Sequence, residues 1–254
     1  MSTINTPKKT IFFLGATGGC GFATLRRCLE AGHSCIALCR IPSKLSARLS
    51  PSLLANLRLE EGNAHDPSAI ARCLVNPSSP DRMVDMVISS IGLPINFKTF
   101  SIDDPHVCEK ALRALLEALA RVRKSGATTA TGNSSPRIVT LSTNGIAETG
   151  RDFPLLEYPL YHVLLRVPHR DKKAMEDALV ASGERWTVVR PALLTDGPAV
   201  GKVRAGVEDV AGRRVERSEI GYSISREDVG GWVFENLVQE SDESWLHKAA
   251  SITY

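Results

Sequence analysis

The sequence predicts an α/β fold with a doubly wound parallel sheet, and two observations lead to this prediction. Short apolar segments of strand length alternate with segments of helix length over nearly all of the 254 residues. Strands that are apolar throughout are typical of a parallel sheet covered by helices on both faces. The first apolar segment also runs into a glycine-rich loop and then a helical stretch, the order expected at the start of a dinucleotide-binding fold.

The predicted elements follow one another as strand and helix along the chain. The expected strands are Thr10–Leu14, Ser34–Cys39, Leu57–Glu60, Asp85–Ser90, Arg137–Ser142, Trp186–Arg190 and Ala249–Thr253. The expected helices are Gly21–Ala31, Pro67–Leu74, Pro105–Arg123, Arg170–Ser182 and Arg226–Gln239. Residues 124–136 are rich in small polar residues and are expected to form a surface loop. We expect one domain spanning residues 1–254, in which residues 192–222 form a small C-terminal substrate-side lobe or lid.

The composition argues against several classes of protein. The net charge is +3 and the basic residues are scattered, so we expect no nucleic-acid partner. The apolar runs are too short to cross a bilayer, so we expect no membrane partner, and nothing indicates an oligomer. The six cysteines form no C-x-x-C pair, and no cluster has metal-ligand spacing, so we expect no metal. The polar first nine residues do not resemble a secretory leader, so we expect a cytoplasmic protein with reduced thiols.

The glycine-rich loop is the predicted phosphate site. It reads Gly15-Ala16-Thr17-Gly18-Gly19-Cys20-Gly21, a G-x-x-G-x-x-G pattern. The first glycine permits a tight turn, the second lets backbone N–H groups approach the phosphates, and the third lets the helix pack close to the strand.

Arg40 follows the second predicted strand and determines the expected cofactor. An acidic residue near this point binds the ribose 2′-hydroxyl of NAD, whereas an arginine there accepts the 2′-phosphate of NADP. We therefore expect NADP(H), with Lys44 as a second cation.

The next two strands end in small polar segments that would line the same site. Asn63 and Ala64 follow the third strand and are expected to meet the adenine edge. Asp66 before Pro67 is instead expected to cap the next helix. The fourth strand ends at Ser89-Ser90-Ile91-Gly92, where the nicotinamide ribose would pass.

Together with the segments Leu141–Gly145, Thr187–Pro191 and Ser223–Val229, these motifs resemble the atypical short-chain dehydrogenase/reductase superfamily, and within it the NmrA-like branch. The similarity covers nearly the whole chain. It implies a Rossmann-type sheet and a nicotinamide cofactor, with Pro191 beside it. A fold of this kind does not determine the substrate.

Reductases of the superfamily usually combine a Ser that binds the substrate oxygen, a Tyr that passes the proton, and a Lys four residues after that Tyr. Ser142 fits the position of the Ser, with Thr143 as its alternative. The chain has no Tyr-x-x-x-Lys, and counting back from the end of the helix places Lys172 at the Lys position. The residue four before it is Pro168, which has no proton to donate.

Three interpretations of this departure remain open. Lys172 binds the ribose and phosphate while His169, Tyr161 or water supplies the proton. Alternatively, Tyr161 or Tyr158 reaches in from the preceding loop, or the chain has no proton-transfer apparatus.

The expected function is an NADP(H)-dependent oxidoreductase that reduces or oxidises a small, largely apolar organic molecule in secondary metabolism. The apolar pair Leu193-Leu194 would line the substrate side of the pocket. The alternatives are a non-redox isomerase or cyclase of natural-product synthesis, and a non-catalytic sensor of NADP(H). The missing Tyr-x-x-x-Lys favours the sensor.

Overall fold

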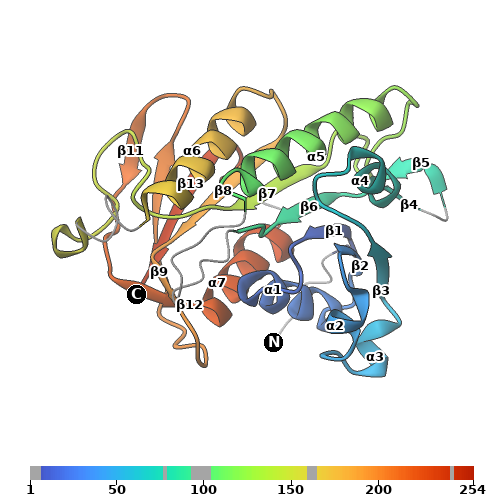
Figure 1. Ribbon diagram of the computed structural model, residues 1–254, viewed down its shortest axis with the longest axis horizontal. Helices are drawn as coiled ribbons and strands as arrows, with labels where there is room; N and C mark the ends of the chain where they lie inside the picture. Colours follow the sequence, from blue (N-terminus) through green and yellow to red (C-terminus); the bar gives the residue numbers. More distant parts are fainter. Residues whose placement is uncertain (1–6, 77–78, 93–103, 159–164, 241–242) are drawn as a thin grey trace.

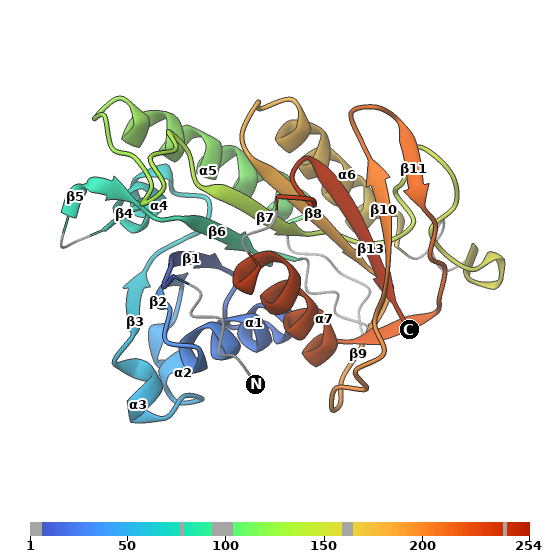
Figure 2. The same cartoon turned by 180° about the vertical axis from the view of Figure 1, so that it is seen from behind.

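The computed structural model describes residues 7–76, 79–92, 104–158, 165–240 and 243–254. Its centre is a nine-stranded sheet with the order β11-β10-β13-β8-β7-β6-β1-β2-β3. The strands that pair in parallel are β3 (Leu57–Glu61), β2 (Ser34–Cys39), β1 (Thr10–Leu14), β6 (Met86–Ser89), β7 (Arg137–Leu141), β8 (Trp186–Pro191) and β13 (Lys248–Thr253). β10 (Arg204–Asp209) and β11 (Arg214–Arg217) add an antiparallel edge. Figure 2 shows this edge and β3 at opposite ends of the sheet.

Helices cover both faces of the sheet (Figure 1). One face packs against α1 (Gly19–Glu30) and α7 (Arg226–Val233), which continues into a π-helical turn at Phe234–Gln239. The other face packs against α4 (Pro67–Leu74), α5 (Val107–Arg123) and α6 (Arg166–Val180). Successive residues of a strand point to opposite faces, so in β1 Phe13 joins the first core and Phe12 the second. The predicted doubly wound α/β fold is confirmed.

Shorter elements complete the chain. They are α2 (Pro42–Ser46), α3 (Pro51–Leu54), β4 (Val75–Asn76), β5 (Ser79–Met83), β9 (Leu193–Thr195), β12 (Ser223–Ser225) and a 3₁₀ turn at Leu155–Glu157. β9 and β12 form a small parallel pair outside the main sheet.

All predicted strands lie within one residue of their observed ends, but one helix start was wrong. α6 begins at Arg166 and not at Arg170, so Pro168 lies inside its first turn. A proline is tolerated there because the first N–H groups of a helix have no intrahelical acceptor. As a result, His169 and Lys172 belong to one continuous helix.

The segment 124–136 is irregular, as predicted, but it is not simply a surface loop. Ala127, Thr129 and Ser135 are buried. The backbone of Thr128 hydrogen-bonds to Asp81 and Met83, which fixes the segment along β5. Residues 192–222 were predicted as a substrate-side lobe or lid, and within them β10 and β11 extend the main sheet.

Candidate functional site

A cavity of about 640 Å³ opens at the carboxyl ends of the parallel strands, where β1 and β6 lie side by side. The chain continues from β1 to β2 on one side and from β6 to β7 on the other. Ligands of open α/β sheets bind at such a switch point. The predicted residues that line the cavity are Gly15, Thr17, Gly18, Gly19, Cys20, Gly21, Arg40, Asn63, Ala64, Ser90, Ile91, Gly92, Ser142, Lys172 and Pro191.

The glycine loop has two positions at which only glycine fits. Gly15 has φ +84°, and a Cβ there would lie 2.8 Å from the backbone of Ser90. A Cβ on Gly21 would lie 2.1 Å from the Ser90 hydroxyl and 2.6 Å from the carbonyl oxygen of Gly15. Ser90 donates a hydrogen bond to that same carbonyl oxygen at 2.9 Å. The loop therefore runs tightly against the end of β6, and the free N–H groups at the start of α1 form a site suited to a phosphate.

Arg40 lies at the end of the cavity that is formed by the loops after β2 and β3. It is exposed and follows β2, beside Gly62 and Asn63, which follow β3. Lys44 is exposed on α2, and it does not line the cavity. The predicted residues Ala16 and Ser89 are buried and do not line it either. Asp66 accepts a hydrogen bond from the Ser68 N–H at 2.8 Å, so its predicted role as a helix cap is confirmed.

Ser142 and Lys172 lie on the same cavity, at the end of β7. The Lys172 ammonium donates hydrogen bonds to the carbonyl oxygens of Leu141 at 2.6 Å and Ile91 at 2.7 Å. The Ser142 side chain is buried, and its hydroxyl has no hydrogen-bond partner among the described residues. A buried hydroxyl without a partner costs about 1–3 kcal/mol, which a bound ligand would offset. The glycine cradle and this orphaned hydroxyl fit a dinucleotide with a substrate beside it.

Asp171 fixes α6 next to Lys172, and no pattern in the sequence predicted this role. This carboxylate is buried on α6 and accepts hydrogen bonds from the backbone N–H groups of Cys108 at 2.8 Å and Glu109 at 2.9 Å. It therefore caps the start of α5 and ties α6 to it, one residue before Lys172. A cap supplied by a residue 62 or 63 positions away leaves no local signal in the sequence.

The predicted proton donors are not brought to the cavity in the described part of the chain. His169 is buried on α6 and does not line the cavity. Tyr158 is exposed, and its ring packs against Phe153. Tyr161 lies outside the described residues.

Other residues line the cavity without having been predicted to do so. They are Leu38, Cys39, Gly62, His65, Asp104, Val107, Leu141 and Arg226. Leu194, from the apolar pair that was expected on the substrate side, lines the cavity as predicted.

The cysteines are buried and form no disulfide. Burial raises the pKa of the Cys20 thiol to about 11, and Arg226 and Lys172 only partly offset it. The Cys108 thiol also has its pKa raised to about 11, again chiefly by burial. Both thiols are therefore protonated at neutral pH and are poor nucleophiles.

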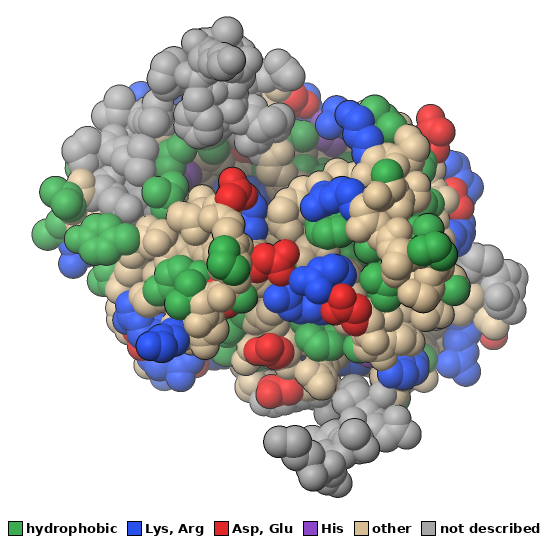
Figure 3. Space-filling view, turned by 90° about the horizontal axis from the view of Figure 1, so that it is seen from below, with side chains coloured by type: hydrophobic (Ala, Val, Ile, Leu, Met, Phe, Trp, Pro, Cys, Tyr) green, Lys and Arg blue, Asp and Glu red, His purple; other side chains and the backbone are tan. Residues whose placement is uncertain are grey.

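Within the ranges that the structure describes, no three His, Cys, Asp or Glu side chains are grouped so as to hold a metal ion. Over the same ranges, no helix has the length and apolar character needed to span a membrane. Figure 3 shows acidic and basic side chains interspersed on the face that carries α1 and α7.

Comparison with known proteins establishes the family. Residues 15–240 match the sequence family described as NAD(P)H-binding. The chain belongs to this family. It is 39% identical to "Reductase pytE" of Aspergillus terreus, over 99% of this chain and 100% of that protein. It is 36% identical to "Oxidase pynE" of Aspergillus niger, over 97% of this chain and 99% of that protein.

Solved structures show the same fold. A short-chain dehydrogenase/reductase from Veillonella parvula in complex with NADP has a TM-score of 0.70 and 16% identity, covering 98% of this chain and 95% of that one. The anaerobilin reductase ChuY of Escherichia coli has a TM-score of 0.63 and 18% identity, covering 96% of each chain. The predicted superfamily is thus confirmed, and the chain is an NAD(P)H-binding oxidoreductase.

Proposed function

We propose that this oxidoreductase uses NADP(H) to reduce a carbonyl group of a small, largely apolar organic molecule in fungal-type secondary metabolism. The observation that carries the proposal is the convergence of the glycine loop, Arg40, Ser142 and Lys172 on one cavity at the switch point of the sheet. The names of the two Aspergillus relatives support redox chemistry, one in each direction.

The residues at the adenosine end favour NADP(H) over NAD(H). Arg40 follows β2, where an acidic residue would select the 2′-hydroxyl of NAD, and its guanidinium suits a 2′-phosphate. Lys44 adds positive charge nearby on α2. We assign the adenine edge to Asn63 and Ala64, and the pyrophosphate to the glycine loop.

The bound nicotinamide supplies the hydride for the reduction. Ser142 donates a hydrogen bond from Oγ to the substrate carbonyl oxygen, which gives this buried hydroxyl a partner. Lys172 holds the nicotinamide ribose, because two of its N–H bonds are fixed on Leu141 and Ile91 and the third remains for the ligand. The substrate oxygen must also gain a proton, and we assign this proton to the Ser142 hydroxyl, which water entering the cavity then reprotonates, because all three N–H bonds of Lys172 are already engaged.

The substrate side is apolar. Leu194 lines the cavity, and Leu193 is exposed next to it. We propose that residues 192–222 form the substrate-side lobe of a single domain. We further propose a cytoplasmic location, which the buried, unpaired cysteines support.

The test has two stages. Titration with NADPH and NADH, followed by nicotinamide fluorescence, is expected to show tighter binding of NADPH. Turnover of a panel of apolar ketones, aldehydes and conjugated enones with NADPH is then followed at 340 nm.

Ser142→Ala should lower kcat by about 10²-fold, as expected for the loss of a hydrogen bond made to developing charge, with little change in the Kd of NADPH. Ser251→Ala, another buried serine but on β13 and away from the cavity, is the matched control and should behave as the wild type. A substrate converted without net consumption of NADPH would replace the proposal with a redox-neutral enzyme. Tight, redox-selective binding without conversion of any substrate would indicate a sensor.

A further inference from the structure

We propose that Arg226 binds the pyrophosphate of the cofactor, and that Asp196 is the counterion that Arg226 releases when the cofactor enters. The inference rests on the proposed function, since it assumes that the cavity holds a dinucleotide. It assigns a role to the Ser223–Val229 motif, which the mechanism above leaves unused.

The first observation is that the Arg226 side chain lies directly on the glycine loop. Arg226 lines the cavity. A Cβ added to Gly19 would lie 2.2 Å from Arg226 Cδ, and 3.2 Å from its Cβ and Cγ. Gly19 is the first residue of α1, so the arginine stem crosses the helix terminus at which a phosphate would bind. The same guanidinium acts on the Cys20 thiol, where it partly offsets the rise in pKa caused by burial.

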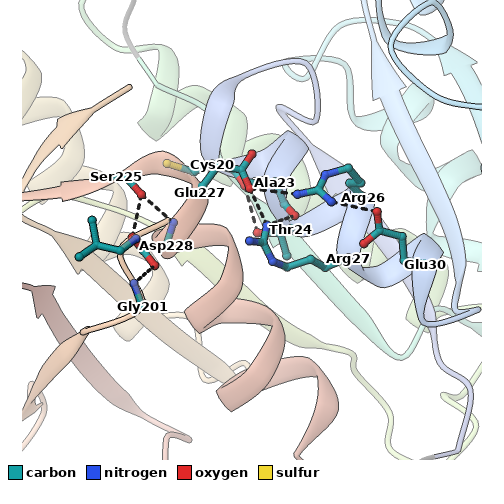
Figure 4. Close-up of polar contacts among 11 residues, drawn as sticks. Cys20, Ala23, Thr24, Arg26, Arg27, Glu30, Gly201, Ser225, Glu227 and Asp228 are labelled. Carbon is teal, nitrogen blue, oxygen red and sulfur yellow. Dashed lines mark hydrogen bonds and ion pairs between the residues drawn. The ribbon is translucent and has the colours of Figure 1, made fainter. Parts of the chain in front are cut away.

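The second observation is that α7 is fixed to α1 directly after Arg226. Glu227 forms ion pairs with Arg26 at 3.0 Å and Arg27 at 2.9 Å, both on α1 (Figure 4). One helical turn later, a Cβ on Gly230 would lie 2.4 Å from the Cβ of Ala23, so the two helices are in close contact. These contacts fix the position of the Arg226 backbone relative to the glycine loop.

The third observation is that the loop carrying Asp196 is fastened to the same turn of α7. The Asp228 carboxylate accepts hydrogen bonds from the N–H groups of Val200 at 2.7 Å and Gly201 at 3.0 Å, and from the Ser225 hydroxyl at 2.9 Å (Figure 4). Asp196 is thus close to Arg226 whether or not the two side chains are paired.

The ion pair between Arg226 and Asp196 is weak enough for a phosphate to displace the carboxylate. Arg226 Nη1 and Asp196 Oδ1 are 2.8 Å apart, but the Asp196 side chain is 92% exposed and the Arg226 side chain 34%. Exposed pairs of this kind stabilise proteins little. A pyrophosphate offers two anionic groups with the geometry that a guanidinium binds bidentately.

The other cations on the cavity are placed for different parts of the ligand. Arg40 follows β2 at the adenosine end, and Lys172 is held by carbonyls at the ends of β6 and β7. Arg226 alone among these three is packed on the first turn of α1. It is therefore the cation that the geometry gives to the pyrophosphate.

The experiment measures Kd values for NADPH and NADH by fluorescence titration at low ionic strength. NADPH and NADH share the pyrophosphate but differ in the 2′-phosphate. Arg226→Gln should weaken both by the same factor, about tenfold or more, because one charge-assisted hydrogen bond is lost. Arg40→Gln should weaken the binding of NADPH but not that of NADH. Asp196→Asn should tighten both by about two- to fivefold, the range expected for removal of an exposed competing pair.

Arg185→Gln is the matched control. Arg185 also carries one ion pair, with Glu243, and its side chain is 26% exposed. It precedes β8 and so lies at the opposite edge of the sheet, and both Kd values should be unchanged.

The outcomes separate this inference from the proposed function. Wild-type affinity for both cofactors in R226Q would overturn it, as would weaker binding in D196N, since that would make the pair a structural contact. If R226Q does not fold, D196N alone tests the inference, because the loss of a merely structural contact cannot tighten the binding of both cofactors. A wild type that binds neither cofactor would instead overturn the proposed function.

Discussion

The buried arginine at the end of β8 gives a sharp test of how the site is supported. Arg190 lies between Glu176 of α6 and Glu208 of β10, and all three side chains are less than a tenth exposed. Arg190 donates to Glu176 through Nη2 at 2.6 Å and Nε at 3.1 Å, and to Glu208 through Nη1. Burial alone would lower the pKa of Arg190, but the two carboxylates outweigh it and hold the pKa above its ordinary value.

Arg190→Met would leave two carboxylates buried without their cation. Breaking a buried pair by removal of one partner costs about 3–5 kcal/mol. For a domain of this size each kcal/mol lowers Tm by about 2–4 °C, so we expect a loss of roughly 10 °C. Urea unfolding at pH 7, followed by far-UV circular dichroism, measures the free energy directly.

The companion variant replaces Arg190, Glu176 and Glu208 together by methionine. Apolar replacement of a whole buried ionic cluster is often neutral, so most of the lost stability should return. The reasoning is refuted if Arg190→Met costs less than about 1 kcal/mol, the size of an exposed pair. It is refuted equally if the triple variant is as unstable as the single one, because the uncompensated charges would then not be the cause.

Two further predictions concern other buried carboxylates. Asp171→Ala should cost about 1–2 kcal/mol in urea unfolding, because the start of α5 loses its cap, whereas Asp171→Asn should cost less because an amide oxygen still accepts one bond. An equal loss in both variants would contradict the cap. Burial opposes the charge of Asp228, but hydrogen bonds from the Tyr254 hydroxyl, the Val200 N–H and the Ser225 hydroxyl outweigh it and hold its pKa below the ordinary value. The stability that the Asp228 carboxylate contributes is therefore present above about pH 4 and is lost as the pH falls through the lower pKa of the folded state. In Asp228→Asn, the free energy of unfolding measured from pH 7 to pH 2 should therefore fall less steeply at acid pH than in the wild type. An unchanged slope would contradict this.

The sequence predicted those elements that are defined by residues close to one another along the chain. Most of the parallel strands could be placed within one residue because they are largely apolar runs bounded by polar residues. The exception is β3, which reads Leu-Arg-Leu-Glu-Glu and is half-buried. β11 is exposed throughout and forms an edge, so its sequence carries no such pattern. The glycine loop and Asp66 were likewise recognisable because their partners lie within a few residues. Asp171 contacts residues 62 and 63 positions away, and Arg226 lies against Gly19, 207 positions away (226 − 19), so only the fold reveals these contacts.

The Thr187–Pro191 motif, which helped to identify the superfamily, contributes to the site chiefly by binding α6. Pro191 lines the cavity, but its neighbour Arg190 is buried against Glu176, four residues after Lys172. Residues four apart on a helix share a face, so this ion pair fixes α6 one turn beyond Lys172.

On the other side of Lys172, Asp171 ties α6 to the start of α5. The lysine is thus held between two buried carboxylates that bind different elements. Although the chain lacks the Tyr-x-x-x-Lys pair, two buried carboxylates fix the helix that carries Lys172. This support holds the Lys172 ammonium at the cavity, on the carbonyl oxygens of Leu141 and Ile91, where the proposed function places the cofactor.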